Sequence, residues 1–224
     1  MTLADRYHQV LQQISDACVK TGRAPADVHL IAVSKTHPVS LVNELAAFGQ
    51  VDFGENRIAE LAEKRAVAQG KIQWHLIGQL QTNKVKLLEA DTILHSLDRE
   101  SLAEKLAARF AGSGIRCLIQ VNCSGEANKS GVAPTDFDKL VDCIARFPAI
   151  QVQGLMTMAE HSDKEKVIRA AFAELRGLSE KLAASRIFPQ YAGWLSMGMS
   201  GDFPYAIAEG ATHVRVGSAI FGNR

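Results

Sequence analysis

The spacing of apolar and polar positions changes repeatedly along the chain. Residues 3–21 carry apolar side chains at helical spacing, which predicts an amphipathic helix ahead of the first strand. Residues 28–34 form a run of mostly apolar and β-branched positions that is typical of a buried strand. Short apolar runs and longer amphipathic stretches then follow one another without a break. The sequence therefore predicts strands that alternate with helices.

The alternation gives eight strand–helix units, the last one truncated. We place the strands at residues 28–34, 51–54, 72–77, 91–95, 115–122, 150–156, 193–196 and 212–216. The helices between them are expected at 39–48, 57–69, 82–89, 99–111, 135–147, 164–184 and 203–209, with a final turn at 218–221. Strict alternation implies parallel strands joined by right-handed crossovers. We expect a TIM-type (β/α)8 barrel, an α/β fold that spans residues 1–224 as one domain. A doubly wound open sheet is the alternative, although it usually has fewer strands.

Composition and charge exclude several classes of protein. Hydrophobic residues make up 47% of the 224 positions and charged residues 22%, as in an ordinary globular protein. A formal net charge of +1 gives no electrostatic reason to expect nucleic acid or an anionic membrane as a partner. The amino terminus has no apolar signal core and no apolar run reaches membrane-spanning length, so we expect a cytoplasmic protein. The four cysteines form no CxxC pair and are expected to be buried, reduced thiols that bind no metal.

The first strand ends in a lysine, Lys35, at the rim where a barrel of this kind carries its chemistry. A lysine at the end of a buried strand must reach water, find a partner or give up its proton. Taken alone, this stretch favours a side chain that extends to solvent. The residues at the other strand ends change that interpretation, because polar and glycine residues gather on the same rim.

Two glycine-rich turns follow the seventh and eighth strands, at residues 196–201 and at Gly217-Ser218. Loops at these places form the usual phosphate site of TIM barrels, where backbone N–H groups and a helix dipole attract an anion. The alternative is that they make only tight turns and a helix cap, at Ser200 or Asp202. Two such turns on neighbouring strands favour the phosphate interpretation.

Arg215 is placed by alternation on the same face of the last strand as His213, just as Lys35 shares a face with Val33. The first and eighth strands are neighbours in a closed barrel, so we expect Lys35 and Arg215 to meet over its end. A second cation would lower the pKa of a buried lysine, as a Schiff-base lysine requires. An aldehyde that carries a phosphate fits these groups, and pyridoxal 5′-phosphate is that molecule. The alternative for Arg215 is an ion pair inside the barrel.

The strand-end stretches resemble those of the pyridoxal phosphate homeostasis protein family. In order, from about residue 31 to residue 222, they are AVSKTHP, FGENR, WHLIGQLQTNK, VNCSGEANKSG, GLMTM, LSMGMSGDF and VRVGSAIFG. The resemblance implies a barrel of the alanine racemase N-terminal kind, with pyridoxal 5′-phosphate bound covalently to one lysine. The cofactor-binding residues that it implies are Lys35, Asn56, Met156, Ser196, Met199, Ser200, Arg215, Gly217 and Ser218.

Within that set, the resemblance implies that Lys35 forms the Schiff base, that Arg215 faces the ring nitrogen and that Ser200, Gly217 and Ser218 hold the phosphate. An arginine cannot give a proton to the ring nitrogen, so the ring becomes a weaker electron sink. Asn56 is expected beside the ring, or else as the cap of the following helix.

The family is understood to bind and buffer the cofactor and to influence vitamin B6 and amino-acid balance. We therefore expect a monomeric homeostasis protein without catalytic turnover, with PLP-dependent apo-enzymes as candidate recipients. Racemases of this fold need a second proton-transfer group from an extra domain, and a chain that ends at Arg224 leaves no room for it. Tyr191 and Tyr205 are the residues to suspect of that task, although Tyr205 is typical of a packed residue.

Several alternatives stay open at this point. A PLP-dependent amino-acid racemase or decarboxylase would use the same Schiff base, and an aldolase-like barrel would use Lys35 directly on a sugar phosphate. His75 is interpreted as a satisfied core histidine. The segment Lys129-Ser130-Gly131 is either a turn or a basic flap over the site.

Overall fold

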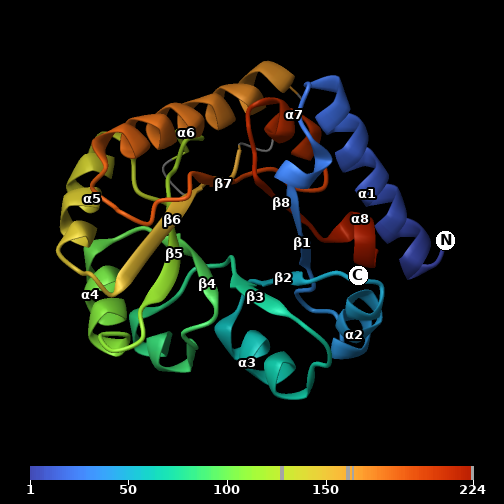
Figure 1. Ribbon diagram of the computed structural model, residues 1–224, viewed down its shortest axis with the longest axis horizontal. Coiled ribbons are helices and arrows are strands. Elements are labelled where there is room, and N and C mark those ends of the chain that lie inside the picture. Colours follow the sequence, from blue (N-terminus) through green and yellow to red (C-terminus); the bar gives the residue numbers. More distant parts are fainter. Residues whose placement is uncertain (127–128, 160–161, 163, 223–224) are drawn as a thin grey trace.

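The eight strands of the computed structural model form a closed barrel (Figure 1). The structure describes residues 1–126, 129–159, 162 and 164–222. Neighbouring strands are parallel and follow chain order, and the last strand pairs with the first. They are β1 (His29–Val33), β2 (Asp52–Glu55), β3 (Gln73–Leu76), β4 (Ile93–Leu97), β5 (Ile115–Gln120), β6 (Ile150–Met156), β7 (Trp194–Ser196) and β8 (His213–Val216). The closed order confirms the predicted TIM-type fold and excludes the doubly wound open sheet.

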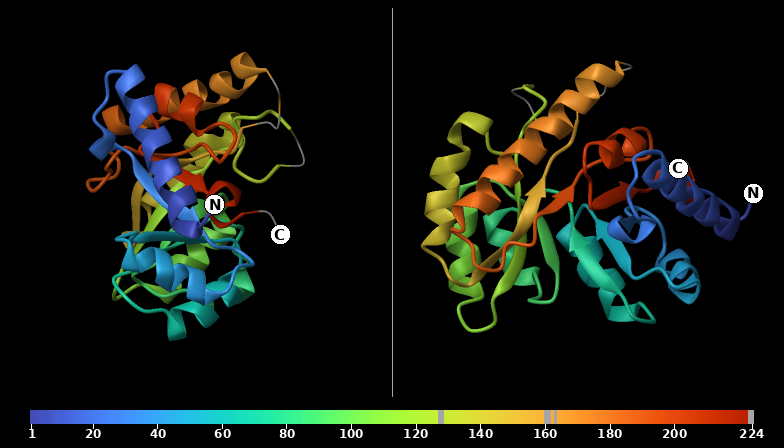
Figure 2. Two further views of the ribbon diagram at one scale, coloured as in Figure 1. Left: turned by 90° about the vertical axis from the view of Figure 1, so that its right-hand side faces the viewer. Right: turned by 45° about the horizontal axis from the view of Figure 1, so that its top comes forward.

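Helices surround the barrel, as expected for parallel strands joined by crossovers. They are α1 (Leu3–Lys20), α2 (Val39–Ala47), α3 (Ile58–Val67), α4 (Glu100–Arg109), α5 (Phe137–Ala145), α6 (Glu165–Ser185), α7 (Phe203–Ala208) and α8 (Ser218–Phe221), with shorter 3-10 helices η1 (Pro25–Asp27), η2 (Thr82–Leu87) and η3 (Pro134–Asp136). The extra helix α1 begins with a reciprocal capping box between Thr2 and Asp5. Figure 2 shows it running alongside α7 and α8, against which it packs.

Element boundaries differ from the sequence-based ones mainly around β4. The predicted strand at 91–95 lies at Ile93–Leu97, and its pairing with β5 shifts register between Leu94 and Leu97. Such an irregularity interrupts the period-two pattern from which the boundary was inferred. The predicted helix at 82–89 is a 3-10 helix, η2, and the one at 135–147 begins as the 3-10 turn η3 before α5.

Side chains of the strands alternate between two packing regions. Outward-facing residues such as Ala32, Phe53 and Val214 join the large apolar cluster beneath the helices. Inside the barrel, Ile93, Leu118 and Met156 form a small separate cluster. The rest of that interior includes several buried histidines, which is unusual because branched apolar residues normally fill it.

All four cysteines are buried and none forms a disulfide, as predicted for reduced thiols. None of the helices in the described part of the chain combines the length and apolar character needed to cross a bilayer. Within those same ranges no group of three or more His, Cys, Asp and Glu side chains is arranged to hold a metal ion.

Candidate functional site

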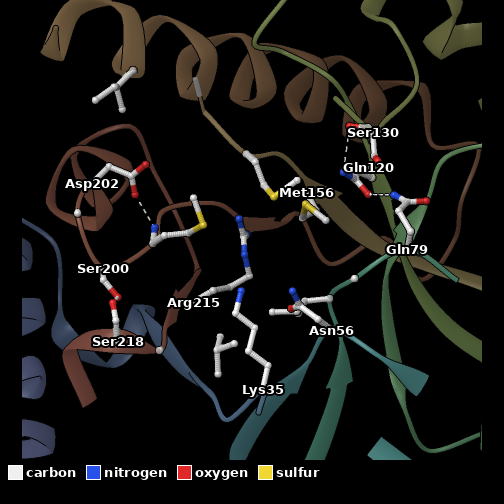
Figure 3. A pocket seen from close by; sticks show the side chains of 18 of the residues that line it. Lys35, Asn56, Gln79, Gln120, Ser130, Met156, Ser200, Asp202, Arg215 and Ser218 are labelled. Atoms are coloured by element: carbon white, nitrogen blue, oxygen red, sulfur yellow. Dashed lines mark hydrogen bonds between the residues drawn. The ribbon is translucent and has the colours of Figure 1, made fainter. Parts of the chain in front are cut away.

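A cavity of ≈ 720 Å³ lies at the carboxyl ends of the strands, where the loops after them meet. Its walls come from segments that are far apart in the sequence, and Figure 3 shows the side chains of Lys35, Asn56 and Arg215 gathered in it. The predicted cofactor residues that line it are Lys35, Asn56, Met156, Met199, Ser200, Arg215, Gly217 and Ser218. Ser196 is placed differently: it is fully buried and lies behind Arg215 rather than on the wall.

Lys35 is the inward-facing residue that directly follows β1, and its backbone is held on both sides. Ser34, just before it, faces outward and is fully buried. The carbonyl oxygen of Ser34 accepts a hydrogen bond from Lys64 Nζ at 2.7 Å. Thr36, just after it, has a left-handed φ of 64° and donates its N–H to the carboxylate of Glu60. The lysine is half-buried and extends into the cavity instead of into solvent (Figure 3).

A buried ionic cluster lies behind this segment, between β2 and α3. Lys64 Nζ is 2.6 Å from Glu55 and 2.8 Å from Glu60, and Ser34 Oγ donates to Glu55 at 2.6 Å. Burial raises the pKa of Glu55, although the hydrogen bonds from Lys64 and Ser34 oppose that shift. One carboxylate oxygen of Glu55, Oε2, has no hydrogen-bond partner among the described residues. Because Lys64 is the shared partner, its loss would leave the fully buried carboxylate of Glu55 and the partly buried carboxylate of Glu60 without their cation.

Arg215 lies in the neighbouring strand β8, whose register pairs it with Ile31 on β1. Its side chain is almost completely buried. One terminal nitrogen donates to Ser196 Oγ at 2.8 Å and the other to the carbonyl oxygen of Thr157 at 2.9 Å. Burial lowers the pKa of Arg215 to about 10, against the opposing charge of Asp202, so the guanidinium stays charged at neutral pH. Its two hydrogen bonds hold that charge at a fixed place in the cavity wall.

The two glycine-rich turns meet on one side of the cavity (Figure 3). The hydroxyls of Ser218 and Ser200 are 3.3 Å apart. Gly198 has a φ of +89°, and a Cβ there would lie 2.6 Å from the Cβ of Ala206. A Cβ at Gly217 would lie 3.1 Å from the carbonyl oxygen of Val33, so this turn also approaches β1 closely. The glycines thus let two hydroxyl-bearing turns pack together on one wall.

Neither Asp202 nor Asn56 caps a helix with its side chain, which was the alternative interpretation of each. Asp202 is the N-cap residue of α7, but its carboxylate accepts from the N–H of Met199 in the preceding turn and caps no helical N–H. Arg57, not Asn56, is the N-cap residue of α3, and Asn56 is half-buried on the cavity wall. A Cβ at Gly78 would lie 2.1 Å from the carbonyl oxygen of Asn56, so the segment after β3 can approach Asn56 only with glycine there.

Sequence reasoning missed a chain of amides on the opposite wall. Gln79 donates to the side-chain oxygen of Gln120 at 2.7 Å, and Gln120 donates to the carbonyl oxygen of Ser130 at 3.0 Å. Gln120 is the last residue of β5 and is almost fully buried. Its inward position was the available signal, because alternation along β5 places it two residues after the inward-facing Leu118. These contacts tie the loop that includes Ser130 to the barrel.

The remaining candidates lie away from the cavity wall. The Tyr191 hydroxyl is 2.6 Å from Ser179 Oγ on α6, and Tyr205 packs against the main apolar cluster. His75 is fully buried and hydrogen-bonded, as predicted for a core histidine. Lys129 donates to the carbonyl oxygen of Ala159 and pairs with Glu126. Residues 127–128 of the predicted VNCSGEANKSG motif, and Arg224, lie outside the described residues.

Comparisons with known proteins agree with this geometry. The family model "Alanine racemase, N-terminal domain" matches residues 12–224. A pyridoxal phosphate homeostasis protein of Pseudomonas aeruginosa is 41% identical and covers 100% of this chain and 96% of its own length. A crystal structure of an unknown protein from Bifidobacterium adolescentis is 36% identical, with a TM-score of 0.89, over 98% of this chain and 94% of that one.

A second solved structure, PipY of Synechococcus elongatus with PLP bound, is 34% identical with a TM-score of 0.79, over 93% of this chain and 100% of that one. The family model and the solved structures agree on the fold, and the full-length relatives are pyridoxal phosphate homeostasis proteins. The chain belongs to the pyridoxal phosphate homeostasis protein family, and its barrel is the alanine racemase N-terminal domain.

Proposed function

We propose that this protein binds pyridoxal 5′-phosphate in the cavity, holds it as a Schiff base on Lys35 and serves the intracellular homeostasis of vitamin B6 and amino acids. The observation that carries the proposal is that Lys35, Arg215 and the hydroxyls of Ser200 and Ser218 line one cavity. The cofactor supplies an aldehyde that condenses with a primary amine and a ring that withdraws electrons from the bond so formed. The PLP-bound relative with the same fold supports this assignment.

Each part of the cavity then has a task. Lys35 supplies the amine, and the turns that carry Ser200 and Ser218 receive the phosphate through hydroxyl and backbone N–H donors. Gly217 lets the second of these turns approach β1. Asn56 and Met156 form the walls beside the ring, and Met199, which is exposed, borders the opening. Ser196 acts on the cofactor only through Arg215, because its side chain lies behind the guanidinium.

Arg215 is the reason to propose storage rather than carbanion chemistry. A guanidinium with a pKa of about 10 is a cation at neutral pH and can only donate hydrogen bonds. Facing the ring nitrogen, it keeps that nitrogen unprotonated, and the ring withdraws electrons less strongly than it would beside a carboxylate.

The lining residues also favour a non-catalytic role. Among the described residues of the cavity wall, the titratable side chains are Lys35, Asp202 and Arg215. A racemase needs a second proton-transfer group on the other face of the ring. Asp202 is the remaining candidate, and its carboxylate already accepts the N–H of Met199 within its own turn. We propose a monomer in the cytoplasm that passes the cofactor to PLP-dependent apo-enzymes.

Cofactor uptake and turnover test this function separately. Purified protein titrated with pyridoxal 5′-phosphate should develop the visible absorption of a Schiff base, and Lys35→Ala should abolish it. Lys71→Ala, at an exposed lysine outside the cavity, is the matched control and should behave as the parent protein. A protein that stays colourless with added cofactor would contradict the proposal.

Turnover is measured by incubating the loaded protein with each amino acid in deuterated water. We expect Cα exchange no faster than with free cofactor. Exchange at an enzymatic rate would contradict the non-catalytic role and identify a racemase or decarboxylase-type enzyme instead. Mixing the loaded protein with an apo-enzyme and following recovery of that enzyme's activity tests delivery.

A further inference from the structure

A continuous chain of hydrogen bonds runs through the barrel interior from Arg215 toward the opposite end. Arg215 donates to Ser196 Oγ at 2.8 Å, and Ser196 Oγ is 2.9 Å from His95 Nδ1. His95 Nε2 is 2.8 Å from His75 Nδ1, and His75 Nε2 is 3.0 Å from Asp52 Oδ1. The five side chains come from five strands, β8, β7, β4, β3 and β2. The barrel thus brings side chains that are far apart in the sequence into one continuous line of hydrogen bonds.

This line of polar side chains lies in the barrel interior, which branched apolar residues normally fill. His75, His95, Ser196 and Arg215 are each at most 4% exposed, whereas the side chain of Asp52 is 25% exposed near the other end of the barrel. Buried polar atoms without partners cost several kcal/mol of folding free energy, so such a line persists only where each member is satisfied. Every side chain between the two ends has a hydrogen-bond partner on both sides.

With both imidazoles neutral, the two ends fix the direction in which every bond is donated. Arginine can only donate and a carboxylate can only accept. His75 must therefore carry its proton on Nε2, facing Asp52, which leaves Nδ1 as an acceptor. His95 then donates from Nε2 to His75 and accepts on Nδ1 from the hydroxyl of Ser196. Ser196 in turn accepts from Arg215, so all four bonds are satisfied with both imidazoles neutral.

The surroundings of the two histidines agree with neutral rings. Burial lowers the pKa of His75, although the hydrogen bond to Asp52 opposes it, and burial lowers the pKa of His95 well below its usual value. Besides Asp52 and each other, the charged or titratable groups that act on them are His29, His213, Arg116 and Arg215. Burial raises the pKa of Asp52, but the hydrogen bond from His75 opposes it and the net shift is downward, so the carboxylate is ionised at neutral pH.

We propose that Asp52, His75, His95 and Ser196 form a positioning relay that orients Arg215 toward the ring nitrogen of the bound cofactor and sets the strength of that contact. The proposal rests on the proposed function. Hydrogen bonds in such a chain polarise one another, so the anion at Asp52 makes Ser196 a better acceptor for Arg215. Asp52 thereby acts on a ligand that it does not touch.

The test in the cofactor-free protein uses ¹⁵N NMR of the imidazoles. We expect His75 and His95 to be neutral with the proton on Nε2 at pH 7. The Asp52→Asn variant should lose this uniform tautomer, and Asp52→Glu should restore it. A charged ring, or a proton on Nδ1 of either histidine in the parent protein, would overturn the relay.

The test in the loaded protein uses cofactor labelled with ¹⁵N at the ring nitrogen. In the parent protein its shift should be that of an unprotonated, hydrogen-bonded pyridine. Asp52→Asn and Ser196→Ala should move it toward the value of a pyridine without that bond and weaken cofactor binding by about tenfold, the effect of one hydrogen bond. Ser196→Thr keeps the hydroxyl and should rescue the shift.

Asp91→Asn is the matched control for charge, because the exposed side chain of Asp91, which precedes β4, pairs with Arg65 instead of with the relay. It should leave both readouts unchanged. A parent protein that takes up no cofactor would overturn the proposed function and the relay's role together. If the parent protein binds the cofactor but Asp52→Asn and Ser196→Ala show the same ring-nitrogen shift as the parent, the relay is overturned and the proposed function is not.

Discussion

Ser34 donates its hydroxyl to the carboxylate of Glu55 at 2.6 Å, and these residues are the outward-facing neighbours of Lys35 and Asn56 on the cavity wall. Lys64 reinforces the link, because its ammonium contacts both Glu55 and the carbonyl oxygen of Ser34. The ends of β1 and β2 are therefore tied together on one side so that Lys35 and Asn56 stand together on the other.

Removing Lys64 tests this link. Lys64→Met leaves the buried carboxylate of Glu55 and the partly buried carboxylate of Glu60 without their cation and should lower the free energy of unfolding by about 3–5 kcal/mol. Urea unfolding at pH 7 measures the loss. Lys71→Met, at an exposed position, should change it by less than about 0.5 kcal/mol. Equal stabilities for the two variants would show that the cluster does not hold the strand ends.

The buried histidines predict a loss of stability in acid. Burial lowers the pKa values of His75 and His95, and it lowers that of His213 to about 3. The unfolded chain takes up protons on these residues below about pH 6.5, whereas the folded chain does not, so stability falls as the pH falls through that range. Glu55, whose pKa is raised, acts in the opposite sense just above the ordinary carboxylate range.

Three histidines with lowered pKa values destabilise the fold in acid, and one carboxylate with a raised pKa opposes them. We therefore expect the free energy of unfolding to drop by at least about 1 kcal/mol between pH 7 and pH 5. Urea unfolding at both values measures it. The His95→Gln variant has one such histidine fewer and should show a smaller drop. A stability that rises on acidification would contradict the neutral, buried state of these rings.

Gly198 is predicted to be irreplaceable in the turn after β7. Gly198→Ala forces a side chain into a left-handed φ and a contact with Ala206, and it should cost about 1–3 kcal/mol of stability and weaken cofactor binding. The control is Gly177→Ala, in α6, where a Cβ has nothing within 4 Å. That variant should gain about 0.5–1 kcal/mol, since alanine is the better helix former. Thermal unfolding of the two variants measures both changes, and a Gly198→Ala variant as stable as Gly177→Ala would contradict the prediction.

The hydroxyls of Ser200 and Ser218 predict a phosphate-dependent effect. If the two neighbouring hydroxyls receive the phosphate as proposed, the double variant Ser200→Ala with Ser218→Ala should weaken binding of pyridoxal 5′-phosphate by about tenfold or more, because each would lose a hydrogen bond to a charged group. Binding of pyridoxal, which lacks the phosphate, should be unchanged, and fluorescence or absorbance titration measures both. A similar loss for the two ligands would place the phosphate elsewhere.

Hydrophobic periodicity was enough to predict the barrel, whereas the eight predicted residues on the cavity wall came from strand-end chemistry together with the family resemblance. Alternation placed Arg215 on the same face of β8 as His213, because each strand keeps its two faces distinct, and the structure shows that this face points into the barrel. Ser196 was assigned to the cofactor although it lies behind Arg215, since alternation fixes the face of a strand but not the depth along the barrel. That residues 1–224 form one domain stays a prediction, which a single cooperative unfolding transition would support.

What the sequence did not reveal depends on contacts between distant strands. His75 and His95 are 20 residues apart, and the hydrogen bond between them follows only from the barrel's register. The pairing of Glu55 with Lys64 likewise needs the packing of α3 against β2. The boundary of β4 was missed because its register shift breaks the pattern from which strands are inferred.

The central claim is that Lys35 holds the cofactor covalently. The most direct measurement is borohydride reduction of the loaded protein followed by peptide mapping in a mass spectrometer. We predict one reduced cofactor per chain, on the peptide that contains Lys35, in the parent protein and in Lys71→Ala, and none in Lys35→Ala. A label spread over other lysines, or retained in Lys35→Ala, would contradict the account.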